Sequence, residues 1–257
     1  MSDKFFVSSD IHSAYTPWME SLNEAGFDID NPNHKIVICG DLFDRLDETV
    51  QCFEFVKNLG GRVIYVKGNH ESLLFDCVNE IRQGRVPSSH HFHNGTVKTI
   101  CQFCGENEWI MYDPTWRDKI CDIMQPILDW IDEKCLDYAE IGDYVFVHGW
   151  IPCNHGAENF RLAWSGDWER ARWENGMEKW KYPQNRVDGK TIVCGHWHCS
   201  YGWSHIRQQL PEFPQKNKKN WLKSFEPFID NGIAAIDSCV AYTGKVNVLV
   251  LEGEVWK

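Results

Sequence analysis

Acidic side chains, one amide and five histidines recur in short motifs spread over most of the chain. The motifs read DIH at 10–12, GDLFDR at 40–45, GNHE at 68–71, HG at 148–149 and GHWH at 195–198. Carboxylates, an amide oxygen and neutral imidazoles form a mixed donor set that suits Mn, Fe, Zn, Co or Ni. The candidate ligands are Asp10, His12, Asp41, Asn69, His148, His196 and His198. They exceed what one tetrahedral ion needs, which predicts two divalent ions that share a carboxylate.

Such a pair of ions has a recognised chemistry. Two divalent ions can clamp a phosphoryl group and lower the pKa of a bound water towards about 7. Hydrolysis of phosphate monoesters is among the slowest uncatalysed reactions known, so it needs this kind of activation. One such motif alone is more often a turn or a core histidine, whereas five in order favour a metal-dependent phosphoester hydrolase.

Apolar runs precede every motif and predict the strands that position them. These runs are KFFVSS (4–9), KIVICG (35–40), RVIYVKG (62–68), YVFVH (144–148) and KTIVCG (190–195). Helical spacing at 18–26 and 48–58 separates the first three, which predicts parallel strands with ligand chemistry at their carboxyl ends. The later runs, with IAAID (233–237) and KVNVLVLE (245–252), predict a second, partly antiparallel sheet.

Length and charge limit the remaining possibilities. The 257 residues fit a single α/β domain, and we expect an insertion at about 84–143 with its own helix at about 118–135. Eleven acidic against three basic residues at 106–143 predict a solvated helix face, with a lid or a partner surface as alternatives. The net charge of −11 argues against nonspecific nucleic-acid binding and against adhesion to anionic membranes.

Cysteine usage and the opening residues bear on location. The start MSDKFFVSSDIH lacks a signal-peptide core, and no run of apolar residues is long enough to span a bilayer. Eleven cysteines then predict reduced thiols and a cytoplasmic location. Cys101 and Cys104 form a CxxC pair that His90, His91 and His93 could complete as a zinc site. The simpler interpretation of this pair is a polar loop followed by a hairpin turn.

On these motifs the chain resembles the calcineurin-like metallophosphoesterases, and within them the phosphoprotein phosphatase branch. The resemblance covers residues 4–71 closely and 144–252 through shorter motifs. It implies an α/β fold with two packed mixed β-sheets flanked by helices and a βαβαβ start. It also implies that Asp41 bridges two ions, one held by Asp10, His12 and His198 and the other by Asn69, His148 and His196.

The same resemblance assigns the groups that act on substrate. It implies that His70 is the general acid, that Asp44 orients it, and that Arg45 binds the phosphate. A second phosphate-binding arginine is expected after His148, where we prefer Arg172 to Arg170. Either arginine could instead pair with Glu169 or Glu174.

Substrate identity leaves two hydrolase classes open. The first is a phosphomonoesterase resembling bacterial or phage serine/threonine protein phosphatases, with manganese as the first choice of metal and a phosphoprotein or small phosphoester as substrate. The alternative is a dinucleoside polyphosphate or nucleotide hydrolase. It is suggested by seven tryptophans between 150 and 203 and by the ending IAAID…GKVNVLVLE, which looks like that of diadenosine tetraphosphatases. A basic segment at 205–223 could attract either anion. A noncatalytic scaffold is disfavoured because all the expected ligands, Asp44 and His70 are present.

Overall fold

The computed structural model describes residues 3–154, 161–210, 222–252 and 255–256. One of its sheets has six strands, in the order β13-β12-β1-β2-β3-β4. The parallel strands are β1 (Lys4–Ser8), β2 (His34–Cys39), β3 (Val63–Val66) and β4 (Cys135–Leu136). α1 (Tyr15–Glu24) connects β1 to β2, and α2 (Thr49–Leu59) with the 3-10 turn η1 (Gly60–Arg62) connects β2 to β3. β12 (Leu249–Glu252) pairs antiparallel with β1, and β13 (Val255–Trp256) pairs with β12. The predicted βαβαβ start is therefore confirmed.

The second sheet is built from the middle and late part of the chain. β6 (Tyr144–Phe146), β9 (Thr191–Cys194) and β11 (Ile233–Ala235) are parallel. β5 (Ala139–Ile141) and β10 (Phe228–Asp230) add antiparallel edges. A separate two-stranded ribbon joins β7 (Cys153–Asn154) to β8 (Arg161–Leu162). The sheet is partly antiparallel, as predicted.

The position of β12 differs from the prediction, because this strand belongs to the first sheet and not to the second. The run 245–252 was expected in the second sheet, but its strand β12 hydrogen-bonds to β1 in the first. This pairing covers the edge of β1 that the parallel strands leave open. It also places Leu251 among the fully buried residues between the two sheets.

Three apolar layers hold the two sheets and their helices together. Phe5 and Val7 of β1 face the second sheet, where Phe146 and Val193 pack against them. Phe6 points to the opposite face of β1, towards α1 and α2, because successive strand residues alternate between faces. A third layer covers the outer face of the second sheet, beneath α8 (Gly176–Trp180). The protein is thus an α/β fold of two mixed sheets flanked by helices.

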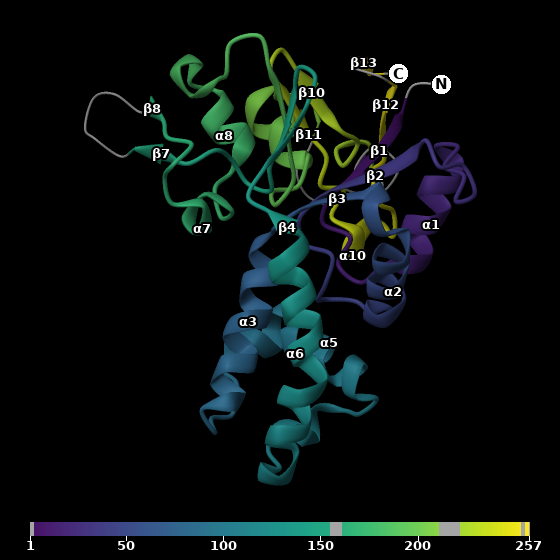
Figure 1. The fold of residues 1–257 in the computed structure, drawn as a ribbon. Coiled ribbons are helices and arrows are strands. Elements are labelled where there is room, and N and C mark those ends of the chain that lie inside the picture. Colours follow the sequence, from purple (N-terminus) through teal and green to yellow (C-terminus); the bar gives the residue numbers. More distant parts are fainter. Residues whose placement is uncertain (1–2, 155–160, 211–221, 253–254, 257) are drawn as a thin grey trace.

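Residues 69–134 form a helical arm. Its helices are α3 (Asn69–Arg82), α4 (Ser89–Asn94), α5 (Thr96–Cys104) and α6 (Arg117–Lys134), with 3-10 turns η2 (Glu108–Met111) and η3 (Pro114–Trp116) between α5 and α6. α3 and α6 pack together, and Figure 1 shows them projecting away from both sheets. α6 matches the helix predicted at about 118–135. β4 and β5 follow it and return the chain to the two sheets.

The CxxC pair belongs to this arm. Cys101 and Cys104 lie on α5, so the expected loop and hairpin turn are wrong. Val97, Ile100 and Cys101 are buried on one helix face, which accounts for a helix in place of a turn. Among the described residues, the groups placed to hold a metal ion include neither cysteine.

Short helices complete the second half of the chain. They are α7 (Trp168–Ala171), α8, the 3-10 turn η4 (Pro183–Asn185), the π-type turn η5 (Gly202–Ile206) and α10 (Val240–Thr243). In the part of the chain that the structure describes, no helix has the length and apolar character needed to cross a bilayer.

Candidate active site

The predicted motifs lie in loops that follow the parallel strands and meet at one edge of the sheets. Their backbone is held in a conformation that residues other than glycine rarely adopt. Positive φ angles occur at Asp10 (51°), His12 (48°), Asp41 (57°), Asp44 (75°), Arg45 (64°) and His196 (65°). Such strained residues cluster where the surrounding structure fixes a functional geometry.

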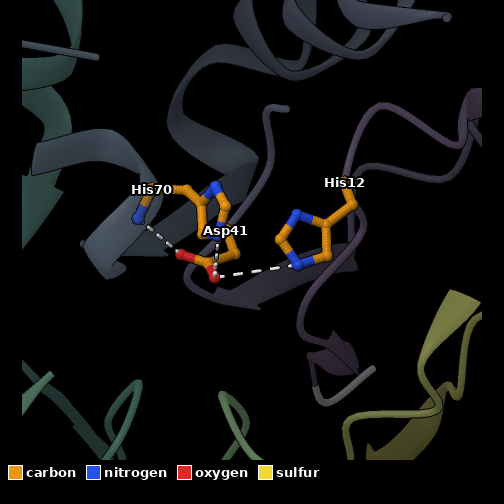
Figure 2. A group of neighbouring side chains, drawn as sticks. All are labelled: His12, Asp41 and His70. Atoms are coloured by element: carbon orange, nitrogen blue, oxygen red, sulfur yellow. Dashed lines mark hydrogen bonds and ion pairs between the residues drawn. The ribbon is translucent and has the colours of Figure 1, made fainter. Parts of the chain in front are cut away.

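Asp41 is the centre of a first group with His12 and His70 (Figure 2). Its Oδ2 lies 3.8 Å from His12 Nε2 and 3.9 Å from His70 Nε2. His12 Nδ1 donates to the Phe43 carbonyl at 3.0 Å, which leaves Nε2 free to face the carboxylate. A hydrogen bond of this kind fixes the tautomer of a metal-binding histidine.

Asp41 also belongs to a second group, with His148 and His196. His148 Nδ1 donates to the Cys39 carbonyl at 2.8 Å. Its Nε2 therefore faces inwards, 2.8 Å from Asn69 Oδ1 and 3.4 Å from Asp41 Oδ1. Asp41 is thus shared by both groups, which fits the bridging role that the family resemblance implies for it.

Asp10 joins the two halves of the molecule at this site. Its Oδ2 accepts the backbone N–H of His196 at 2.9 Å, and its Oδ1 lies 3.9 Å from His12 Nε2. Burial and the nearby carboxylate of Asp237 raise the pKa of Asp10 well above its usual range. Asp237, which is 3% exposed, was not among the predicted site residues. Its position directly after the run IAAI resembles that of Asp10 and was the available signal.

The pKa values of the two histidines of the second group shift in opposite directions. Burial opposes protonation of His148, but Asp41 and its other acidic neighbours outweigh burial and raise its pKa to about 10. For His196, burial and the nearby His148 lower the pKa to about 3. Asp41 is buried, yet the surrounding histidines hold its pKa well below its usual value.

These donors fit divalent metal ions. Asp10, Asp41, Asn69 and His148 are each at most 2% exposed, and all offer oxygen or imidazole nitrogen. Three carboxylates repel one another here. Asp237 and Asp41 raise the pKa of Asp10, and Asp41 also raises the pKa of Asp237. A cation held between them would remove this repulsion. The residues that would hold ions are Asp10, His12, Asp41, Asn69, His148 and His196.

His70 and Asp44 form a buried pair beside the first group. His70 Nδ1 donates to Asp44 Oδ2 at 2.7 Å, and Asp44 is fully buried. Burial opposes protonation of His70, but Asp41 and the bond to Asp44 outweigh it and raise its pKa. The Arg45 guanidinium lies 3.3 Å from His12 Nε2 and 3.4 Å from His70 Nε2. The structure thus brings the predicted acid, its partner and the predicted phosphate ligand together.

Glu71 braces these loops, a role not assigned from the sequence. Its carboxylate accepts the backbone N–H groups of Gly68, Asp41 and Leu42 at 2.7, 3.0 and 2.9 Å. It also accepts the Tyr65 hydroxyl at 2.7 Å. Gly68 is required here because a Cβ at this position would lie 2.1 Å from Asp41 Oδ1. Glu71 therefore fixes the spacing between the GDLFDR and GNHE loops.

Two predicted site residues, Arg172 and His198, lie outside the two groups that could hold a metal ion. Arg172 is buried and pairs with Glu169 and with Asp137, the latter at 2.6 Å, and it donates to the Lys67 carbonyl at 3.2 Å. The structure thus favours the ion pair over phosphate binding for Arg172. His198 is half exposed and lies 4.0 Å from Asp237 Oδ2, outside both metal-binding groups. It therefore lies beside Asp237, whose carboxylate acts on Asp10.

Arg170, the alternative to Arg172, and Arg207 of the basic segment each lie beside an acidic side chain. Arg170 lies 3.9 Å from Glu174, and its side chain is mostly exposed. In the basic segment, Arg207 pairs with Asp230. The lysines of the segment at 216, 218 and 219 lie outside the described residues.

Trp173 lies at the rim of the cluster. Its ring is edge-on to the His196 imidazole, with centroids 5.8 Å apart, and 49% of the residue is exposed. The ion pairs of Arg172 anchor the backbone directly before it. Trp150 and Trp180, by contrast, are core residues. The rim therefore presents a partly exposed indole next to the metal-binding groups.

A family model described as calcineurin-like phosphoesterase matches residues 4–226. The chain belongs to this family. It is therefore a metallophosphoesterase, and the resemblance stated from the motifs is confirmed at the level of the family.

Named relatives share only part of their length with this chain. A symmetrical bis(5'-nucleosyl)-tetraphosphatase of Actinobacillus succinogenes is 33% identical over 79 residues, which is 31% of this chain and 28% of that protein. One from Histophilus somni is 26% identical over 121 residues, 46% of this chain and 42% of that protein. A solved structure assigned as a diadenosine tetraphosphatase has a TM-score of 0.51 at 13% identity, over 100% of this chain and 93% of that chain. The matched segments span less than half of the curated relatives.

Proposed function

We propose that this metallophosphoesterase uses His70 as the general acid, Asp44 to orient it, and Arg45 to bind the phosphoryl oxygens. The position of Arg45 carries the proposal. Its guanidinium lies within 3.4 Å of both His12 Nε2 and His70 Nε2. An anion that binds this guanidinium is therefore next to the imidazole that must protonate the leaving oxygen.

Each protein group has a distinct task in this scheme. The Arg45 fork can hold two phosphoryl oxygens at once. Asp44 holds Nδ1 of His70, so Nε2 is the atom that delivers the proton to the departing oxygen. Divalent ions, with manganese as our first choice, supply charge neutralisation at the phosphoryl oxygens and activation of the attacking water when bound.

For the substrate, we propose a dinucleoside polyphosphate. Two features support it: the names of the curated relatives, and the exposed Trp173 indole beside His196, which is suited to stacking on a nucleobase. A phosphorylated protein or small phosphomonoester is the second candidate, supported by the GDLFDR and GNHE motifs. It ranks second because Arg172, the expected second phosphate ligand, is occupied by Asp137 and Glu169.

A substrate panel tests the proposal. Purified protein supplied with Mn²⁺ is given diadenosine tetraphosphate, a phosphoserine peptide and p-nitrophenyl phosphate. We expect turnover of all three substrates to require Arg45, turnover of the dinucleotide and the peptide to require His70 as well, and the highest kcat/KM on the dinucleotide. Release of neither phosphate nor nucleotide from any of them would overturn the assignment of activity. A preference for the peptide would move the second candidate to first place.

The thiols support a proposed location. All eleven cysteines are free. Free thiols in this number suit a reducing compartment, and we propose the cytoplasm.

A further inference from the structure

One face of α5 contacts the loop of the GDLFDR motif, which carries Asp44 and Arg45 and is called the catalytic loop below. Thr96, Thr99 and Gln102 recur every three residues, and helix periodicity places them on one side. Thr96 Oγ1 donates to Asp44 Oδ2 at 2.7 Å, and Thr99 Oγ1 donates to Asp44 Oδ1 at 2.7 Å. Both threonines and Asp44 are fully buried. Water therefore cannot replace these bonds.

The same face also holds the backbone of the loop. Asp44 N–H donates to Thr99 Oγ1 at 3.0 Å, and Gln102 Nε2 donates to the Leu46 carbonyl at 3.0 Å. Gly95, directly before α5, packs so closely that a Cβ there would lie 2.3 Å from the Arg45 nitrogen. These contacts support the positive φ angles of Asp44 and Arg45, which would otherwise relax.

We infer that α5 is the positioning element of the catalytic loop, and that Thr96 and Thr99 set the orientation of His70 through Asp44. Each oxygen of Asp44 accepts a threonine hydroxyl, and Oδ2 accepts His70 Nδ1 as well. A carboxylate held at both oxygens cannot rotate, so the imidazole that it orients has one direction in which to present Nε2. The two threonines contact the acid's partner and act through it. This inference rests on the proposed role of His70.

Turnover of two substrates with different leaving groups distinguishes a role in orienting His70 from a role in holding the fold together. Phenyl phosphate and p-nitrophenyl phosphate carry the same ring, but phenolate is the more basic leaving group and depends more on a proton donor. A loss of fold or of metal slows both substrates alike. Misorientation of the acid slows phenyl phosphate more.

The experiment compares both substrates in Thr99→Val, Thr96→Val and the matching serine variants, which restore the hydroxyl. We expect each valine variant to lower kcat on phenyl phosphate by about tenfold and on p-nitrophenyl phosphate by less than about threefold, since a hydrogen bond to a charged group contributes more than one between neutral groups. The serine variants should recover most of the loss. Thr49→Val is the matched control, because its equally buried hydroxyl bonds to Ser13 in place of Asp44.

The outcomes are distinct. Thr96→Val is the milder change, because Thr99 also accepts the Asp44 N–H. If Thr96→Val slows both substrates equally, the inference is overturned. A serine variant that is as slow as its valine counterpart would overturn it too. His70→Asn serves as the reference: if it too slows both substrates equally, the general-acid proposal fails. If His70→Asn is selective and the threonine variants are not, only the role of α5 fails.

Discussion

The indole of Trp173 meets the imidazole of His196 edge-on, at an interplanar angle of 86°. Trp173 is 49% exposed, which leaves part of its indole open for the base stacking that we propose. We predict that Trp173→Ala raises KM for diadenosine tetraphosphate roughly five- to hundredfold, because stacking on a base is worth about 1–3 kcal/mol. KM for a phosphoserine peptide should change little. Steady-state kinetics on both substrates measures the difference.

Trp173→Phe is the control for this prediction, since it keeps an aromatic face at the same backbone position. It should retain most of the affinity for the dinucleotide. If Trp173→Ala weakens the peptide as much as the dinucleotide, the residue shapes the site generally and the stacking role is wrong.

His70 should matter for turnover and little for metal content. We predict that His70→Asn lowers kcat by about 10²- to 10⁴-fold, the usual contribution of a positioned acid. Bound metal, measured by elemental analysis of the purified variant, should stay near the level of the unchanged protein. Parallel loss of metal and turnover would reassign His70 as a ligand, a role that its place beside His12 and Asp41 also permits geometrically.

Removal of metal should destabilise the fold as well as stop catalysis. Asp10 and Asp237 are buried carboxylates, and burial and neighbouring acids raise the pKa of both. Dialysis against a chelator should therefore lower Tm. Added Mn²⁺ should restore it, because a ligand at a hundred times its Kd stabilises by about 2.7 kcal/mol. Titration followed by calorimetry should give two ions per chain. Saturation at one would contradict the paired site.

Stability should fall on mild acidification because of His91. This residue is fully buried, and neither of its ring nitrogens has a hydrogen-bond partner in the described structure. Burial, with His90 adding to it, lowers the pKa of His91 below its usual value of 6.5. The unfolded chain therefore takes up this proton first, and the free energy of unfolding declines as pH drops below that value.

Urea denaturation at about pH 7.5 and about pH 5.5 tests the effect of His91. His91→Leu should show a smaller loss of stability between the two than the unchanged protein. His93→Leu, which changes an exposed histidine on the same helix, should behave like the unchanged protein. An unaltered pH difference in His91→Leu would show that other groups dominate.

Local patterns were sufficient to predict most strands and the meeting of the motifs. The runs before Asp10, Asp41 and Asn69 are apolar and β-branched, and parallel strands end at a common edge. Long-range pairing was not accessible in this way. Nothing in the run 245–252 states that its strand pairs with β1, and nothing near Arg172 indicates Asp137 as its partner.

The supporting residues were harder to foresee than the ligands. Thr96 and Thr99 are ordinary residues in an amphipathic helix until that helix is placed against Asp44. Glu71 was visible in its motif, but its task depends on backbone N–H groups that the sequence does not display. Types of side chain thus indicate chemistry, whereas orientation depends on contacts between distant segments.

The bond from the His196 backbone to Asp10 spans 186 positions of the chain. During synthesis, the amino-terminal half emerges from the ribosome long before its partner loop exists. An early fragment carries Asp10, His12, Asp41 and Asn69, yet it lacks His148, His196 and the β12 edge that complete the centre. The complete cluster and its supporting sheet edge therefore form only after the segments that carry His196 and β12 have been made.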